Sequence, residues 1–134
     1  MTPQHHNTRD RITHVLNDWL PMWNGDIDLA ADLVHPDFQI WFGGFPGAGE
    51  GVRGPDSFLG FLATYRREHP DAMFTPGPMV VDEVAGGAAL VWSVSVTLPG
   101  DEVVSERGGI DQFSFVDGRV RAVWSITGAE ARPF

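Results

Sequence analysis

The sequence predicts an α+β fold in which a cone-shaped, curved antiparallel sheet wraps around three N-terminal helices. Three observations predict it. Apolar residues before about position 70 recur mostly at helical spacing, whereas later apolar residues alternate with a period of two. One short strand-like run, 38–42, lies between the second and third helical stretches. Asp117-Gly118 divides two alternating runs, which is typical of a hairpin closed by a type I′ turn.

The first helix is predicted from a single apolar stripe. Its members recur at i, i+3, i+4, i+7 and i+8, and they are Ile12, Val15, Leu16, Trp19 and Leu20. The side chain of Asn7 or Thr8 can cap the start of this helix. Pro21 should end or kink it, because proline lacks the N–H that a helix interior uses.

A second, shorter helix is predicted over residues 27–34, after a turn at 24–26. Asp26 is a suitable N-cap for it, and His35-Pro36-Asp37 should stop it. The run 38–42 then predicts a strand whose apolar face carries Phe38, Ile40 and Phe42.

The third helix is predicted to begin at Gly54-Pro55, because proline fits the first helical position. The glycine-rich residues 43–54 before it form a loop of the kind that often covers a site. Its apolar stripe is Phe58, Phe61, Leu62 and Tyr65, and His69-Pro70 should end it.

Strands are predicted for the rest of the chain. Residues 72–84 form one, interrupted at 75–78, and Gly86-Gly87 turns the chain into a long strand over 88–98. A turn at 99–102 leads to the hairpin over 107–127. A curved sheet covered by helices leaves one open end, which suits a small apolar ligand.

Length and composition indicate one globular domain over residues 1–134, with 43% hydrophobic residues. The net charge of −9, without a basic cluster, argues against nucleic acid and anionic membranes as partners. The absence of cysteine excludes thiol chemistry. No apolar run approaches about 18 residues and the N-terminus lacks a signal-peptide core, so we expect a cytoplasmic location.

Asp111 is the leading candidate for acid/base chemistry. It shares a strand face with Phe113 and Phe115, and an ionised, unpaired carboxylate is costly to bury there. We expect Asp111 to face a pocket; the alternative is a bond to neighbouring backbone. Asp18 is its candidate catalytic partner, because two carboxylates in one cavity would leave an acid beside a base. The alternative for Asp18 is a solvated helix flank.

Other side chains are candidates for substrate binding. Those expected to wall the cavity or its mouth are Trp92, Phe42, Phe113, Trp23 and Trp41, with Ser125 as a polar contact. His69 is a further candidate, although a histidine that ends a helix also suits interaction with the last carbonyls. Trp124 should lie on the outer sheet face, where a flat apolar surface favours a homodimer.

Neither a metal nor a cofactor is expected. No two histidines share an i, i+4 spacing on a helix. The loop 43–54 has no phosphate-binding glycine pattern in a strand-helix context.

Several stretches, taken in order, carry a resemblance to a known family. They are NGDIDLAADLVHPDF (24–38), GVRGP (51–55), AALVWSVSV (88–96), GIDQF (109–113) and DGRV (117–120). The chain resembles the nuclear transport factor 2-like, or ketosteroid isomerase-like, superfamily in its SnoaL-like polyketide cyclase branch. This resemblance implies a cystatin-like α+β barrel and a small apolar ligand of polyketide or terpenoid type.

One catalytic position of the resembling enzymes keeps its acidic residue in this sequence, and the others hold different residues. Asp111 stands where ketosteroid isomerases keep a protonated Asp and SnoaL-like cyclases a His. The isomerase base falls at Phe42, its oxyanion Tyr at Asp18, and the cyclase Asp at Ser125. The Arg of limonene-type epoxide hydrolases falls at Gly109.

Two functions fit these residues. One is a cofactor-free acid/base enzyme that isomerises, cyclises, dehydrates or opens an epoxide in a small apolar substrate, with Asp111 as acid or oxyanion donor. The other is a non-catalytic module that uses the pocket for binding, or only its dimer surface. The fold alone does not decide between them.

Overall fold

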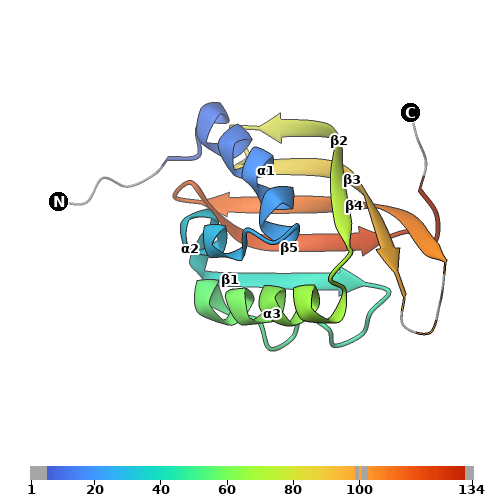
Figure 1. The fold of residues 1–134 in the computed structure, drawn as a ribbon. Helices are drawn as coiled ribbons and strands as arrows, with labels where there is room; N and C mark the ends of the chain where they lie inside the picture. The colour runs from blue at the N-terminus through green and yellow to red at the C-terminus, as the bar shows by residue number, and fades with distance from the viewer. Residues whose placement is uncertain (1–5, 99, 101–102, 132–134) are drawn as a thin grey trace.

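A computed structural model of the chain confirms the α+β class (Figure 1). The structure describes residues 6–98, 100 and 103–131, so the expected turn at 99–102 lies mostly outside the described residues. The helices are α1 (Arg9–Trp23), α2 (Ala30–Leu33) and α3 (Gly54–Glu68), with a 3₁₀ turn, η1, at Ile27–Leu29. The strands are β1 (Val34–Gly43), β2 (Met73–Asp82), β3 (Gly87–Thr97), β4 (Val104–Val116) and β5 (Arg119–Thr127).

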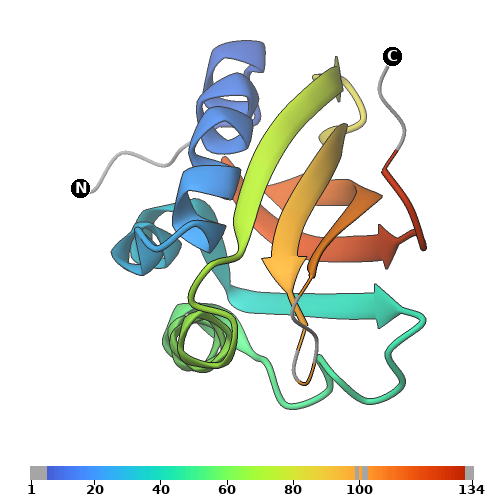
Figure 2. The ribbon, with the colours of Figure 1, turned by 45° about the vertical axis from the view of Figure 1, so that its right-hand side comes forward.

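The five strands form one curved sheet in the order β1-β5-β4-β3-β2. Neighbouring strands are antiparallel except β1 and β5, which pair in parallel. The parallel pair is the one difference from the expected sheet, which was antiparallel throughout. It arises because the chain leaves β1 through α3 before it forms the other strands, and β1 then pairs with the last of them, β5, at the edge of the sheet. The sheet is open, and its concave face is covered by the three helices (Figures 1 and 2).

Helix α1 buries the predicted apolar stripe against the sheet. The Thr8 side chain accepts a hydrogen bond of 3.1 Å from the Arg11 backbone N–H and so caps the helix. Pro21 was predicted to end or kink α1, and it does not end it, because the helix continues to Trp23. The last turn is stabilised by burial of Met22 and Trp23, which compensates for the missing proline N–H.

The segment after α1 differs in detail from the expectation. The predicted second helix is split into η1 and α2, and the Asp26 side chain makes no capping hydrogen bond. Strand β1 begins at Val34, earlier than predicted, and includes Pro36. The register with β5 shifts between Val34 and Gln39, and a proline is tolerated in such an irregular stretch.

The later elements form as predicted, except that β2 continues through the expected interruption at 75–78, with a shift of register between Pro76 and Met79. Pro55 opens α3, and the even-numbered side chains of β3 from Leu90 to Val96 are buried. Asp117 and Gly118 have φ values of 53° and 75°, as a type I′ hairpin turn requires. Helices and concave sheet face share one hydrophobic core. Among the helices in the described part of the chain, none has the length and apolar character of a bilayer-spanning segment.

Candidate active site

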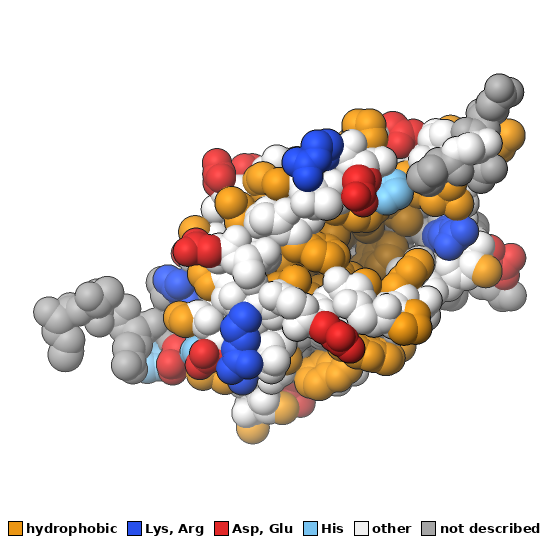
Figure 3. Space-filling view, turned by 90° about the horizontal axis from the view of Figure 1, so that it is seen from below, with side chains coloured by type: hydrophobic (Ala, Val, Ile, Leu, Met, Phe, Trp, Pro, Cys, Tyr) orange, Lys and Arg blue, Asp and Glu red, His pale blue; other side chains and the backbone are white. Residues whose placement is uncertain are grey.

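A cavity of about 460 Å³ lies between the concave face of the sheet and helices α1 and α3. Its volume is within the range of small-molecule sites. Figure 3 shows a hollow walled by hydrophobic side chains, with a histidine and charged side chains near its rim. The lining residues are Leu20, Trp23, Phe42, Phe45, Ala48, Phe61, Tyr65, Glu68, His69, Phe74, Trp92, Val94, Val96, Leu98, Arg107, Asp111, Ser125 and Thr127.

Asp111 is the buried carboxyl of this cavity and is only 4% exposed. Alternation along β4 turns it to the concave face, between Leu90 of β3 and Ser125 of β5. The Trp19 indole Nε1–H, on α1, donates a hydrogen bond of 3.0 Å to Asp111 Oδ2. Asp111 Oδ1 is buried and makes no hydrogen bond to any described residue.

Burial raises the pKa of the Asp111 carboxyl above its ordinary value of 3.8, because the charged form is poorly solvated. The side chains of Ser125, Trp92 and Trp19 oppose this rise. Only Trp19 makes a hydrogen bond of standard geometry to the carboxyl, since the Trp92 indole N–H is without a partner among the described residues. We therefore regard burial as the dominant effect, which favours the neutral acid.

Aromatic rings form a large part of the cavity wall. The Trp23 ring meets the rings of Tyr65, Phe61 and Phe42 edge to face, with centroids 5.3, 6.2 and 6.3 Å away. The indole N–H groups of Trp23 and Trp92 are buried and find no acceptor in the described part of the chain. An indole N–H only donates, so a ligand that satisfies these groups must bring acceptor atoms.

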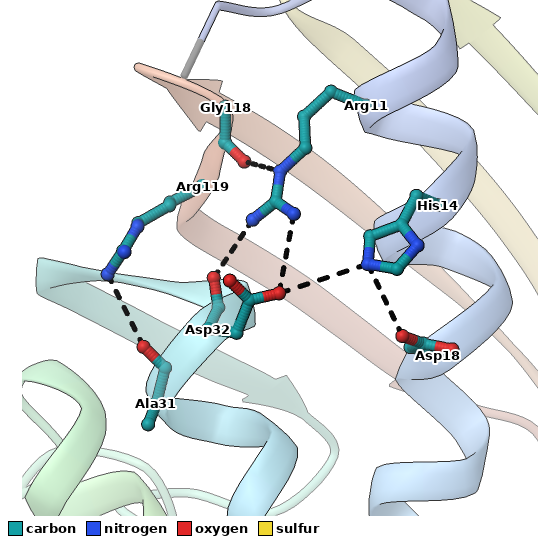
Figure 4. Close-up of polar contacts among 7 residues, drawn as sticks. All are labelled: Arg11, His14, Asp18, Ala31, Asp32, Gly118 and Arg119. Carbon is teal, nitrogen blue, oxygen red and sulfur yellow. Dashed lines mark hydrogen bonds and ion pairs between the residues drawn. The ribbon is translucent and has the colours of Figure 1, made fainter. Parts of the chain in front are cut away.

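The structure places Asp18 away from the cavity, which corrects the expectation of a carboxylate pair. Asp18 lies on the outer flank of α1, and its side chain is 33% exposed. Its carboxylate lies 3.4 Å from His14 Nε2, and the same imidazole nitrogen lies 3.8 Å from Asp32 on α2 (Figure 4). Position 18 therefore belongs to a surface cluster around Arg11 and Asp32, and it cannot share a proton with Asp111.

Two expected wall residues also lie elsewhere. Trp41 is 55% exposed on the outer sheet face, because it alternates with Phe42 along β1. Phe113 is fully buried in the core beneath Trp19, with ring centroids 5.0 Å apart, and does not line the cavity. Trp92, Trp23, Phe42, Ser125 and His69 do line it.

Sequence reasoning missed three side chains of the site. The sequence places Trp19 only in the apolar stripe of the first helix. Its hydrogen bond to Asp111 joins residues 92 positions apart, so no local sequence pattern predicts it. Tyr65 lines the cavity, and burial raises the pKa of its phenol, an effect that Arg66 opposes. Arg107 lies on the same face of β4 as Asp111, and strand alternation alone could have found it.

The described residues contain no group of three His, Asp or Glu side chains placed to hold a metal ion. The titratable side chains that line the cavity are those of Asp111, Tyr65, Glu68, His69 and Arg107.

Residues 16–123 match the model of the SnoaL-like domain, so the chain belongs to the SnoaL-like family of the nuclear transport factor 2-like superfamily. This confirms the resemblance carried by the sequence. No protein of curated function matches it.

Solved structures share the fold. A proposed polyketide cyclase from Acidithiobacillus ferrooxidans superposes with a TM-score of 0.73 at 18% identity, over 87% of each chain. IdmH, a proposed polyketide cyclase from Streptomyces antibioticus, superposes with a TM-score of 0.70 at 20% identity, over 86% of this chain and 90% of IdmH. A protein of unknown function with a cystatin-like fold from Methylobium petroleophilum PM1 superposes with a TM-score of 0.73 at 16% identity. The match covers 97% of this chain and 82% of that protein. At these identities the likeness establishes the fold alone.

Proposed function

We propose that the protein is an acid/base enzyme that uses no cofactor and acts on a small, mostly apolar carbonyl compound bound in the cavity. Asp111 supplies the proton. The observation that carries the proposal is the asymmetry of its carboxyl group. Trp19 occupies Oδ2, whereas Oδ1 is buried beside the cavity without a partner among the described residues. A neutral Asp111 that carries its proton on Oδ1 can donate it to a ligand in the cavity.

The proposed step is enolisation. The proton of Asp111 Oδ1 moves to the carbonyl oxygen of the substrate while a proton leaves the neighbouring carbon to water. The substrate becomes its enol, and the Asp111 carboxylate regains a proton from the same water. Charge that develops on the oxygen is stabilised by a donor in a water-poor site, where hydrogen bonds are strong.

Isomerisation, aldol-type cyclisation and dehydration all pass through such an enol. Epoxide opening by two cooperating carboxylates is disfavoured, because Asp18 lies outside the cavity. A substrate with several keto or phenolic oxygens, as in a polyketide, would also satisfy the indole N–H groups of Trp23 and Trp92. The proposed assignment of structural neighbours as polyketide cyclases agrees with this substrate class.

The test is deuterium exchange. A panel of ring-containing ketones in deuterated water is followed by NMR for exchange at the carbon next to the carbonyl. Asp111→Asn is expected to lower the catalysed exchange by about 100-fold or more, because the general acid is lost. Asp18→Asn is the matched control, since it removes a carboxyl outside the cavity, and it should exchange like wild type. Exchange unaffected by Asp111→Asn would refute the assignment.

A second candidate function is binding without turnover. It is favoured by the position of Asp18, the expected partner carboxylate, outside the cavity, and by the ring-rich wall of the cavity. Panel compounds that quench tryptophan fluorescence saturably, but exchange no faster than in buffer, would support this alternative.

We also propose that two copies pair through the outer sheet face. Trp41 lies in register with Trp124, and Ile126 with Ile110, so exposed apolar side chains form a continuous patch over β1, β5 and β4. The same face is hollowed by about 780 Å³, and Ile110, Trp124 and Ile126 of the patch line this hollow, whereas none of the buried titratable groups discussed above does. The patch therefore suits a self-association surface better than a catalytic site.

A further inference from the structure

The inner face of β4 carries a second charged side chain besides Asp111. Arg107 precedes Asp111 by four positions, so both side chains point to the concave face and both line the cavity. Arg107 pairs across the strands with Val94, a buried residue of the same wall. It is the one lysine or arginine among the described residues that line the cavity.

The environment of Arg107 differs from that of the arginines with structural roles. The Arg66 guanidinium donates to the carbonyl oxygens of Ala72 and Pro70 at 2.6 and 3.0 Å. Arg11 donates to the Gly118 carbonyl at 2.7 Å and also pairs with Asp32. Arg107 Nε is buried, yet within the described part of the chain it has neither a hydrogen-bond acceptor nor an ion-pair partner.

A guanidinium stays charged and only donates, so its unmet N–H groups need acceptor oxygens. Glu68 and His69 also line the cavity, but neither makes an ion pair with Arg107. In a chain of net charge −9, a half-buried arginine that forms no ion pair with any described residue is a specific feature.

The space between Arg107 and Asp111 is apolar. The intervening inward position is Gly109, and the Trp92 ring fills the place of its missing side chain. A Cβ at this position would lie 2.6 Å from Trp92 Cη2, so the indole ring occupies the space over Gly109, between the two charged positions. Four residues of extended strand separate the Cα atoms of Arg107 and Asp111 by about 13 Å.

We propose that Arg107 binds an oxyanion, such as a carboxylate, at one end of an elongated ring-containing ligand whose other end reaches Asp111. The Trp92 indole is the apolar surface on which the rings lie. This inference rests on the cavity being the ligand site, as in the function proposed above. It adds that the substrate is an amphipathic anion, with its charged group separated from the reacting carbonyl by a ring system.

Two fluorescent probes with the same rings test this inference. 8-Anilinonaphthalene-1-sulfonate carries an anionic group, and N-phenyl-1-naphthylamine lacks it. Wild type should bind the sulfonate probe more tightly, and each probe should displace the other. Arg107→Met should weaken binding of the sulfonate probe by at least about tenfold, because a charge-assisted contact is lost. It should leave binding of the neutral probe within about twofold, since no contact of the rings depends on the charge.

Two further variants keep the test decisive. Arg67→Met removes the same charge from the exposed face of α3, where Arg67 Nη2 donates to Thr64, and should change neither affinity. Arg107→Lys keeps the charge and should retain most of the preference for the sulfonate probe. Equal loss of both probes in Arg107→Met, an equal effect of Arg67→Met, or failure of wild type to bind or prefer the sulfonate probe would overturn the inference. The exchange test of Asp111→Asn uses another variant and readout, so either proposal can fail alone.

Discussion

Trp19 and Asp111, 92 residues apart in the sequence, are joined by a hydrogen bond of 3.0 Å between indole Nε1–H and carboxyl Oδ2. The bond connects the centre of α1 to the middle of β4 and fixes which carboxyl oxygen is left for a ligand. Trp19 is itself held by ring contacts with Phe113 and Phe58, at 5.0 and 5.8 Å between centroids. The orientation of the proposed acid is therefore set by the hydrophobic core.

Replacing Trp19 by Phe should raise the pKa of Asp111 further, because one of the hydrogen bonds that lower it is lost. The free energy of unfolding should fall by about 2 kcal/mol, from the lost bond and the smaller ring. Trp23→Phe is the matched control, since it also shortens a buried tryptophan, but one whose N–H has no partner among the described residues. NMR titration of the carboxyl carbon and urea denaturation measure the two effects. An equal pKa change in both variants would contradict the role given to the bond.

Asp111→Asn should alter how stability depends on pH. In wild type the folded state keeps the Asp111 proton to higher pH than the unfolded state does, because burial raises the pKa. The free energy of unfolding therefore falls as pH rises above 3.8, and this loss ends once the folded-state pKa is passed.

The variant lacks this titration, so its stability relative to wild type should increase with pH. Urea denaturation of both proteins, at a series of pH values that starts at the ordinary aspartate pKa of 3.8, measures the difference. A stability difference that stays constant over the whole series would mean that Asp111 titrates alike in the folded and unfolded states.

Gly109→Ala should destabilise the fold by about 1–3 kcal/mol, because the added methyl group overpacks a filled site. Its Cβ would lie 2.6 Å from both Trp92 Cη2 and the Ile126 carbonyl oxygen. Gly60→Ala is the control, since the added Cβ meets nothing within 4 Å on the exposed face of α3. That change should stabilise the helix by about 0.5–1 kcal/mol. Thermal denaturation compares the two, and equal effects would show that Trp92 does not occupy the space over Gly109.

Trp124→Glu should shift the protein toward monomers, because it puts charge into the apolar patch of the outer sheet face. Trp124 is 48% exposed in that patch. Val84→Glu adds the same charge at a fully exposed position in the β2–β3 turn and should leave association unchanged. Light scattering coupled to size-exclusion chromatography gives the mass of each variant. A wild type that is monomeric at high concentration would refute pairing through this face.

Much of the fold follows from local patterns in the sequence. The apolar stripe of α1 and the alternation of β3 predict which faces are buried, because both patterns reflect the geometry of a single element. The parallel pairing of β1 with β5 has no such local signal, since it depends on how α3 returns the chain to the sheet edge. At Pro21 a local pattern is misleading. Proline disfavours a helix, but burial of the residues that follow it outweighs this preference.

The parts of the site that follow from the alternation of side chains along a strand could be predicted from the sequence. Alternation places Asp111 on the concave face, and the same rule puts Trp41 outside and Arg107 inside. Asp18 could not be assigned in this way, because it adjoins the buried stripe of α1, and only the structure shows that its carboxylate lies beside His14, which also approaches Asp32 of α2.

The most direct test of the central claim is the titration of Asp111 itself, followed by the NMR shift of its ¹³C-labelled carboxyl carbon and assigned through Asp111→Asn. The account predicts a pKa clearly above the ordinary aspartate value of 3.8, because burial disfavours the charged form. A pKa at or below that value would contradict it, since a carboxyl that is ionised at all working pH values has no proton to give to a substrate.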